Sequence, residues 1–307
     1  MKNVALLDVT LRDGGYVNGH TWSRQQAATV VSACATAHIP FCEVGYYRPR
    51  RHDVDGADRP TSCCPDDHLR TLCAANPTVT VTVMAHARDV HPTDYRRLAA
   101  LGVGMVRLPA QHAILTDLTP HVEAARAAGL RVAVNLIRVS ELSPRAVAAA
   151  ARLAEQWQVD AFYLADSNGS LFPEQVDRLI RVAGVETAVP LGFHAHDGLS
   201  LAFINSLSAV EAGCRYLDAS LGGMGKGGGN LALELIAGYL RARSQAPHAM
   251  TPLARTAAEV LKPWRDGVLA RCESIAGGLL DLNVDTIKDR HAQNQRELFT
   301  LVDAISG

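Results

Sequence analysis

The chain has 307 residues, of which 48% are hydrophobic and 20% are charged, and its formal net charge is −1. This length exceeds that of a usual single domain, but one α/β barrel can reach about 200–250 residues. The balanced charge gives no sign of a nucleic-acid or membrane surface, and no apolar run reaches the length of about 18 residues that predicts a membrane span.

Cysteine usage and the start of the chain predict a cytoplasmic protein. The seven cysteines are expected to be reduced thiols, because their number is odd and no C-x-x-C pair occurs. The chain enters an apolar run at residue 4, with neither a basic leader nor a signal-type apolar segment before it.

Short apolar runs and helical segments alternate along the chain. The first predicted strand covers residues 4–9, and an Ala-rich helix is predicted over residues 24–37. Helix 143–156 has Ser143 at its N-cap and Pro144 in its first turn. The further strand–helix pairs, in order, are 41–45 with 65–75, 78–84 with 93–101, 105–108 with 118–128, 130–137 with 143–156, 161–165 with 173–182, 190–194 with 199–212, and 216–219 with 230–242.

Eight such pairs predict a (β/α)8 TIM barrel, an α/β fold whose strands are buried on both faces. A doubly wound open sheet is the alternative, but the count of eight and the absence of a glycine-rich turn after the first strand disfavour it. A polar insertion over residues 46–64 is expected to be either a lid that contacts substrate or a solvated loop.

The predicted domain organisation is a catalytic barrel over residues 1–243 and a short C-terminal helical extension over residues 244–307. Helices are predicted in the extension at residues 252–264 and 284–304. We expect them to pack on the barrel, on a neighbouring subunit, or on both, because the extension is too short for a catalytic domain.

Candidate metal ligands lie at the carboxyl ends of predicted strands, where a TIM barrel carries its active site. Asp13 follows the first strand, and His194 and His196 end the seventh. Residues i and i+2 of a strand point to the same face, so both imidazoles can reach one point. With a carboxylate they form a two-histidine, one-carboxylate site for a divalent metal. The alternatives are core histidines and a turn-capping aspartate, and Asn230 is either a further ligand or a helix N-cap.

Other polar groups lie at the same end of the predicted barrel. Arg12 could hold a carboxylate or stabilise an enolate oxygen, or it could form a structural salt bridge. Residues 222–229 form a glycine-rich loop whose backbone amides, that of Gly225 among them, could receive an anion. Ser167 could bind substrate or only close a turn. Further candidate substrate contacts near the ends of strands three to five are His86, Arg107 and Arg138.

Taken together, these motifs resemble the DRE-TIM metallolyase superfamily. The similarity rests on residues 8–14 (Asp-Val-Thr-Leu-Arg-Asp-Gly), on residues 194–196 (His-Ala-His) and on the glycine-rich loop that ends at Asn230. The superfamily includes 4-hydroxy-2-oxoacid aldolases, 3-hydroxy-3-methylglutaryl-CoA lyases and isopropylmalate synthases. Residues 163–167 and 205–234 are most similar to the aldolases, and the resemblance covers about residues 4–240.

The resemblance implies that Asp13, His194 and His196 hold a divalent ion, with Mn²⁺ expected first and Mg²⁺ or another divalent ion as alternatives. The ion would bind the keto and carboxylate oxygens of a 2-oxoacid and favour its enolate, and Arg12 would steady the enolate oxygen. A base would take the proton of the 4-hydroxyl, and the C3–C4 bond would break to give a 2-oxoacid and an aldehyde. These two small molecules are the expected partners, and the resemblance suggests a homodimer.

The chain departs from the catabolic aldolases at the catalytic base. Those enzymes carry a histidine three residues after the metal aspartate, where this chain has Tyr16, and His20 is the candidate replacement. A phenol with its unperturbed pKa of about 10 is a poor base at neutral pH. The C-terminal part matches these aldolases poorly, so their dehydrogenase partner is not carried over. Claisen-type chemistry on an acyl-CoA and a non-catalytic metal-binding barrel stay open as alternative functions.

Overall fold

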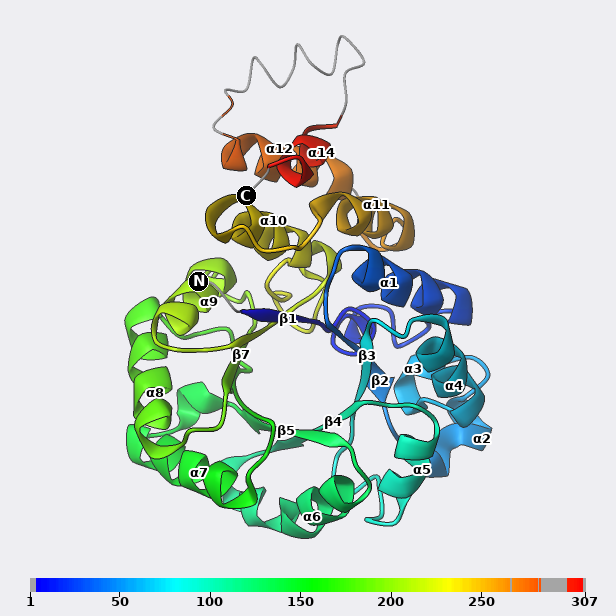
Figure 1. Cartoon of the computed structure of the whole chain (residues 1–307), viewed down its shortest axis with the longest axis vertical. Helices are drawn as coiled ribbons and strands as arrows, with labels where there is room; N and C mark the ends of the chain where they lie inside the picture. The colour runs from blue at the N-terminus through cyan, green and yellow to red at the C-terminus, as the bar shows by residue number, and fades with distance from the viewer. Residues whose placement is uncertain (1–3, 266, 281, 283–296, 306–307) are drawn as a thin grey trace.

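The eight predicted strands form a closed parallel barrel in a computed structural model of the chain (Figure 1). The structure describes residues 4–265, 267–280, 282 and 297–305. Strand β1 pairs with β8, with Leu7 opposite Asp218, so the sheet closes on itself. This closure confirms the TIM barrel and excludes the open sheet. The strands are β1 (Ala5–Asp8), β2 (Phe41–Tyr46), β3 (Thr80–Met84), β4 (Met105–Ala110), β5 (Arg131–Ile137), β6 (Ala161–Asp166), β7 (Leu191–Ala195) and β8 (Tyr216–Ala219).

Helices follow the strands and form the outer ring of the barrel (Figure 1). The predicted cap of α7 is confirmed, because the Ser143 side chain accepts a hydrogen bond from the amide of Ala146. Ser23 and Gln26 form a reciprocal capping box at the start of α1. The outer helices are α1 (Arg24–Thr36), α4 (Asp66–Ala75), α5 (Asp94–Ala100), α6 (Thr119–Ala127), α7 (Pro144–Trp157), α8 (Pro173–Glu186), α9 (Ala202–Glu211) and α10 (Leu233–Ser244).

Apolar side chains fill two separate regions of the molecule. The larger lies between the strands and the surrounding helices, and a smaller cluster is built from residues on the strands or directly after them. The guanidinium carbon of Arg107 lies 4.3 Å from the centre of the Tyr163 ring in this smaller region. The lumen is therefore packed, and a functional site must lie above it, at the ends of the strands.

The polar insertion after β2 is partly folded. Two short elements, η2 (Pro49–Arg51) and α2 (His52–Asp55), have no fully buried residue. In contrast, α3 (Pro60–Cys63) is buried and packs on β2. The insertion therefore combines a solvated outer part with an inner part that is fixed to the barrel.

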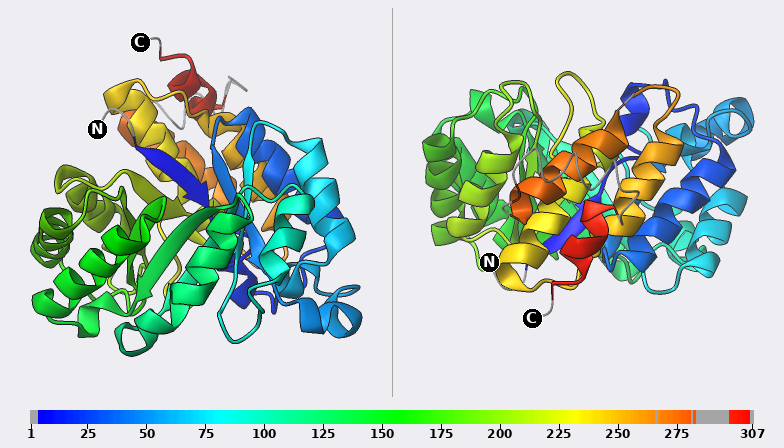
Figure 2. Two further views of the ribbon diagram at one scale, coloured as in Figure 1. Left: turned by 60° about the horizontal axis from the view of Figure 1, so that its bottom comes forward. Right: turned by 90° about the horizontal axis from the view of Figure 1, so that it is seen from above.

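The C-terminal helices stack on α10, and one of them also packs on α1 (Figures 1 and 2). Helix α11 (Met250–Val260) confirms the predicted helix 252–264 and packs on α1. Helix α12 (Val268–Leu279) was not predicted. Most of the predicted helix 284–304 lies outside the described residues, and its described end is α14 (Leu298–Asp303). The domain boundary at residue 243 stays a prediction.

All seven cysteines are free thiols, as predicted, and six of them are buried. Burial raises the pKa of the half-buried Cys73 to about 11, so this thiol is neutral near pH 7. No helix formed by residues that the structure describes is both long and apolar enough to cross a membrane.

Buried histidines make the folded state sensitive to acid, and His68 on α4 allows a test. Burial, with Arg24 nearby, lowers the pKa of His68 to about 4. As the pH falls, His68 therefore takes up a proton in the unfolded chain at a higher pH than in the folded chain. The free energy of unfolding consequently falls as the pH drops from about 6.5 to about 4. We expect His68→Leu to flatten this pH dependence by up to about 1.4 kcal/mol per pH unit. Urea unfolding at several pH values measures it, and an unchanged slope would contradict the expectation.

Candidate metal centre at the barrel mouth

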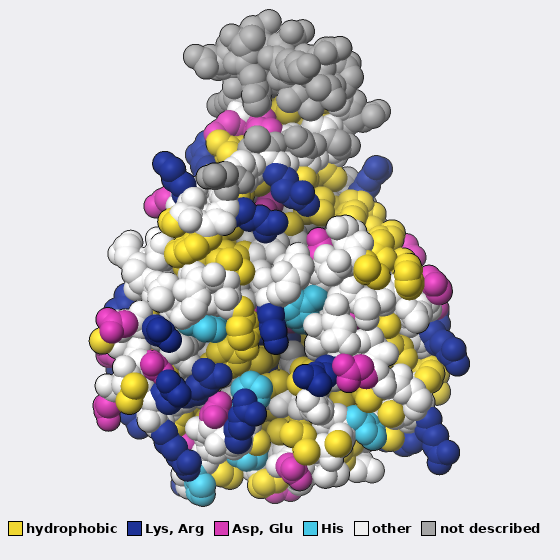
Figure 3. Space-filling view, turned by 180° about the vertical axis from the view of Figure 1, so that it is seen from behind, with side chains coloured by type: hydrophobic (Ala, Val, Ile, Leu, Met, Phe, Trp, Pro, Cys, Tyr) yellow, Lys and Arg dark blue, Asp and Glu magenta, His cyan; other side chains and the backbone are white. Residues whose placement is uncertain are grey.

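Asp13, His194 and His196 come together at the carboxyl ends of β1 and β7. Asp13 lies in the turn after β1, where its amide bonds the carbonyl of Val9. His194 is in β7, and His196 lies one residue beyond that strand. One ligand atom from each of the three buried side chains lies within 4.8 Å of the others. Figure 3 shows this end of the barrel, where histidine, lysine and arginine side chains surround a central hollow.

The hydrogen bonds of the two histidines leave their Nε2 atoms facing each other. Nδ1 of His194 lies 3.0 Å from Oδ2 of Asp218, and Nδ1 of His196 lies 3.2 Å from the carbonyl oxygen of Gly229. Both acceptors favour a proton on Nδ1, which leaves a lone pair on each Nε2. The two Nε2 atoms are 3.3 Å apart, so their lone pairs repel unless a proton or cation lies between them. This arrangement fits a bound metal ion.

The charge states of His196 and Asp13 also suit a cation. Burial, with His194 nearby, lowers the pKa of His196 to about 4, so this ring is unprotonated at neutral pH. Burial opposes ionisation of Asp13, but Arg12 and the two histidines hold its pKa well below its usual range. The site therefore presents nitrogen lone pairs and an ionised carboxylate, which metal binding requires.

Asn230 joins this group from the loop after β8. It pairs with His196 in an isolated β-bridge, and its amide nitrogen donates to Oδ2 of Asp13 at 2.9 Å. Its Oδ1 atom is buried and has no hydrogen-bond partner among the residues described, so it is available to a cation. Ala232 is the N-cap of α10, so the alternative role of Asn230 as N-cap is wrong.

A buried charge network lies behind the candidate ligands, and two of its members, Glu43 and Asp218, were not predicted. Arg12 donates to Glu43 at 2.6 Å, and Arg107 donates to Glu43 at 3.2 Å and to Asp218 at 2.6 Å. Together with Asp13, the network contains three carboxylates and two arginines, so its formal net charge is −1. A divalent cation would change this net charge to +1. Arg107 is fully buried in these contacts, so it positions other residues and does not bind substrate.

Tyr16 and His20 lie in the loop that follows Asp13. The Tyr16 side chain is half-exposed, and its hydroxyl lies 2.9 Å from that of Tyr46. The His20 ring packs against both tyrosines, with ring centres 5.3 and 5.6 Å apart. Burial, with Arg48 nearby, lowers the pKa of His20 to about 4, so this histidine is unprotonated at neutral pH. The structure thus places both candidate bases in one aromatic cluster.

The remaining predicted contacts lie in the loops around the centre. Oγ of Ser167 accepts a hydrogen bond from the amide of Arg138 at 2.9 Å, which leaves the hydroxyl proton free to donate. Gly225 lies directly against Asn230, because a Cβ at this position would be 2.3 Å from the amide nitrogen of Asn230. Only glycine fits there without displacing the candidate ligand. A substrate contact of Ser167 or Gly225 stays a prediction.

A second buried group that could hold a metal consists of Asp8, Cys34 and Cys42. Burial raises the pKa of Asp8 to about 7. The hydrogen bond with Cys34, together with burial, raises the pKa of Cys42 well above its ordinary value. A metal would have to displace protons here, whereas Asp13 is already ionised, so the mouth is the better candidate centre.

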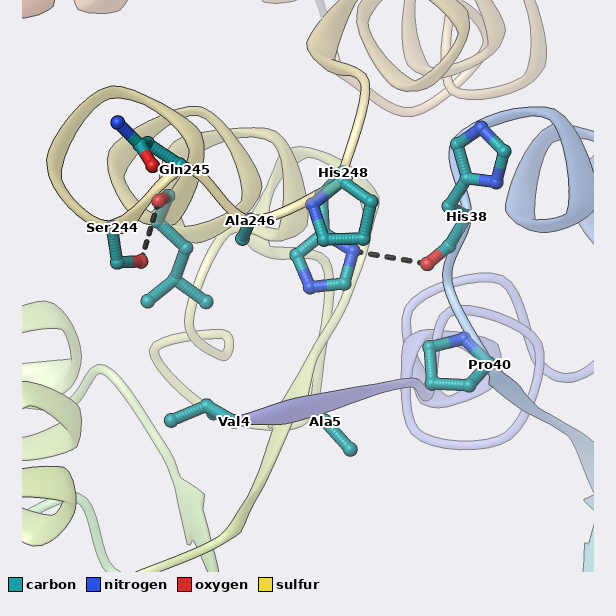
Figure 4. Close-up of a pocket in the computed structure, with 10 residues that line it drawn as sticks. Val4, Ala5, His38, Pro40, Ser244, Gln245, Ala246 and His248 are labelled. Carbon is teal, nitrogen blue, oxygen red and sulfur yellow. Dashed lines mark hydrogen bonds between the residues drawn. The ribbon is translucent and has the colours of Figure 1, made fainter. Parts of the chain in front are cut away.

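A cavity of about 620 Å³ lies at the opposite end of the barrel, beside the start of β1 (Figure 4). Nδ1 of His248 lies 2.9 Å from the carbonyl oxygen of His38 at its edge. No acidic residue, lysine or arginine is among its described lining residues. It lies at the amino ends of the strands, where TIM barrels do not carry active sites. We therefore place the chemistry at the mouth.

Comparison with known proteins gives a family and two named relatives. A family model described as HMGL-like matches residues 3–260. The chain is 30% identical over 251 residues to a 4-hydroxy-2-oxovalerate aldolase from Brevibacillus brevis, and 30% identical over 243 residues to one from Chloroflexus aurantiacus. Each alignment covers 78% of this chain and 70% of the relative.

Solved structures share the barrel. The N-terminal domain of a Bacteroides vulgatus protein superposes with a TM-score of 0.75 at 24% identity, covering 93% of this chain and 96% of the other. The HMG-CoA lyase from Brucella melitensis gives a TM-score of 0.71 at 18% identity, covering 86% and 99%. The carboxyl transferase domain of Rhizobium etli pyruvate carboxylase gives 0.74 at 18% identity, covering 88% and 48%. At these identities the likeness shows the fold alone.

Proposed function

We propose that this chain, which belongs to the HMGL-like family and is an aldolase, a carbon–carbon lyase, of that family, acts on a 4-hydroxy-2-oxoacid. The proposed reaction cleaves or forms the C3–C4 bond of that acid with a divalent metal ion. The observation that carries the proposal is the facing pair of Nε2 atoms on His194 and His196 beside the ionised Asp13. A bound ion would supply Lewis-acid polarisation of the 2-oxoacid. We infer Mn²⁺, because two imidazole ligands suit a transition metal better than Mg²⁺.

Arg12 is the residue that would stabilise the enolate. Its Nη1 atom lies 2.6 Å from Asp13, and its Nε atom is fixed by Glu43. Burial opposes the charge of Arg12, but Glu43 and Asp13 raise its pKa further above its ordinary value. Arg12 is thus a fixed and permanently charged donor beside the candidate metal ligands. It can stabilise the negative charge that develops on the enolate oxygen without first changing its own position.

Tyr16 and His20 would handle the proton of the 4-hydroxyl. In the cleavage direction a base takes this proton, the electrons of the C3–C4 bond pass to the enolate of the 2-oxoacid, and the aldehyde leaves. The enolate then gains a proton at C3. Tyr16 is the more exposed of the two, and Tyr46 holds its hydroxyl in place. We therefore place Tyr16 at the 4-hydroxyl and the unprotonated His20 behind it.

Tyr16→Phe should lower kcat by about 10²–10⁴-fold with metal content unchanged, because it removes the hydroxyl that exchanges the proton but leaves the ring in place. Steady-state kinetics and metal analysis of the purified variant test this. Tyr46→Phe is the matched control, since it removes only the hydroxyl that holds Tyr16, and its loss should be smaller. Full activity of Tyr16→Phe would assign the proton transfer to His20 or to water.

The direct test of the reaction is consumption of pyruvate in the presence of an aldehyde and Mn²⁺, followed by NMR. A parallel sample contains acetyl-CoA with a 2-oxoacid. Formation of a 4-hydroxy-2-oxoacid supports the proposal, whereas turnover of acetyl-CoA alone would overturn it in favour of Claisen-type chemistry. The homodimer and the cytoplasmic location stay predictions.

A further inference from the structure

Two cationic side chains flank the tyrosine pair, just outside the candidate metal centre. Nζ of Lys226 lies 5.5 Å from the centre of the Tyr16 ring, and its backbone amide is 3.3 Å from Oδ2 of Asp13. The guanidinium carbon of Arg48 lies 4.4 Å from the centre of the Tyr46 ring. The two tyrosine hydroxyls are hydrogen-bonded at 2.9 Å, so the two rings form one continuous surface. Lys226 lies at the Tyr16 end of this surface and Arg48 at the Tyr46 end.

Both cations keep unused binding capacity. Lys226 is exposed, and its Nζ makes no hydrogen bond or ion pair with any residue that the structure describes. Arg48 donates from Nε to Asp89 and from Nη1 to the carbonyl of Ser62, both at 3.1 Å. These two bonds fix the guanidinium, and within the described part of the chain its Nη2 atom has no acceptor. A fixed arginine edge and a free ammonium are the groups that bind carboxylate and phosphate.

The rest of this surface is aromatic, and its two histidines, His20 and His86, are unprotonated at neutral pH. His86 stacks on Tyr46, with ring centres 5.8 Å apart and planes inclined by 18°, and His20 packs on the edge of the same ring. Burial lowers the pKa of His86 to about 4. Outside the candidate metal centre, positive charge therefore comes from Lys226 beside Tyr16 and Arg48 beside Tyr46, and Asp89 accepts from Nε of Arg48.

We propose that Lys226 and Arg48 bind an anionic group, a carboxylate or a phosphate, at the distal end of the aldehyde half of the substrate. The inference rests on the proposed function, in which the 2-oxoacid half occupies the space beside Asp13 and Arg12. Tyr16 is assigned to the 4-hydroxyl, which becomes the aldehyde oxygen. What lies beyond Tyr16, away from the ligands, is therefore the remainder of the aldehyde. An uncharged short aldehyde would leave both cations unused.

The test compares matched acceptors in the aldol direction with pyruvate and Mn²⁺. The pairs are succinic semialdehyde against butanal, and glyceraldehyde 3-phosphate against glyceraldehyde. The wild-type protein should prefer the anionic member of at least one pair by about tenfold or more in kcat/KM, because charge-assisted hydrogen bonds contribute that much. The preferred pair identifies the anion as carboxylate or phosphate.

Arg48→Gln and Lys226→Gln should each reduce this preference by about tenfold, mainly through KM, since a bound distal group contributes equally to the ground and transition states. Arg50→Gln, an exposed arginine of the same insertion, is the matched control and should leave the preference unchanged. Hydrogen exchange at C3 of pyruvate, measured without aldehyde, distinguishes failure of this inference from failure of the proposed function. Exchange with no anion preference, or with a preference that survives both substitutions, overturns this inference alone. Absence of exchange and of aldol turnover overturns it together with the proposed function.

Discussion

Asp13→Asn should remove tight binding of a divalent ion, with an affinity loss of at least about 100-fold, and should abolish turnover. Asparagine keeps the shape of the side chain and can still accept the hydrogen bond of Arg12. It loses the negative charge that compensates the ion and that the neighbouring Arg12 stabilises. Calorimetric titration with Mn²⁺, together with metal analysis of the purified protein, measures the effect.

The matched control is Asp8→Asn, which changes a second buried aspartate five positions away in the same segment. Asp8 faces Thr10 and Cys42 and belongs to the other group that could hold a metal. We expect this variant to bind Mn²⁺ normally. Normal binding by Asp13→Asn, with loss of binding by Asp8→Asn, would move the metal to the cysteine-containing group and overturn the assignment of the mouth.

Arg12→Ala should lower kcat by about 10²–10³-fold and change KM much less, because stabilisation of an enolate oxygen acts in the transition state. The side chain is buried and bound at 2.6 Å to both Glu43 and Asp13, so it is already placed before substrate arrives. Removing a buried ion-pair partner also costs stability, by about 3–5 kcal/mol. Kinetics must therefore be measured on protein whose folding and metal content have been verified.

Arg12→Lys separates the catalytic from the structural role. Lysine keeps the positive charge but cannot contact Glu43 and Asp13 with two edges of one rigid group. We expect it to recover most of the stability lost in Arg12→Ala and only part of kcat. Wild-type kcat in Arg12→Ala would show that Arg12 serves only as a structural salt bridge.

The sequence contained enough local information to predict the barrel and the grouping of the candidate ligands. The spacing of His194 and His196 placed both rings on one face of a strand, and strand order brought Asp13 to the same end. These inferences need only the period of a β-strand and the geometry of a parallel barrel. The Ser143 cap was predictable for the same reason, since its hydrogen bond stays within one turn.

The network behind the ligands could not be predicted in this way. Glu43 and Asp218 are single acids inside apolar strands, and their common partner Arg107 is 64 and 111 residues away in the sequence. Strand periodicity shows which residues point inward, but not which of them meet across the lumen. An isolated acid in a buried strand was the available signal, because such a charge requires a partner. The start of α10 was also misplaced, because Asn230 bonds Asp13 and does not cap the helix.

The central claim is that this centre forms the enolate of a 2-oxoacid with a divalent ion. The most direct measurement is exchange of the C3 protons of pyruvate or 2-oxobutyrate with D₂O, followed by NMR, with Mn²⁺ in one sample and EDTA in the other. We predict exchange that requires both the protein and the metal. Absence of exchange from protein shown to contain Mn²⁺, or exchange that is equally fast in EDTA, would contradict the account.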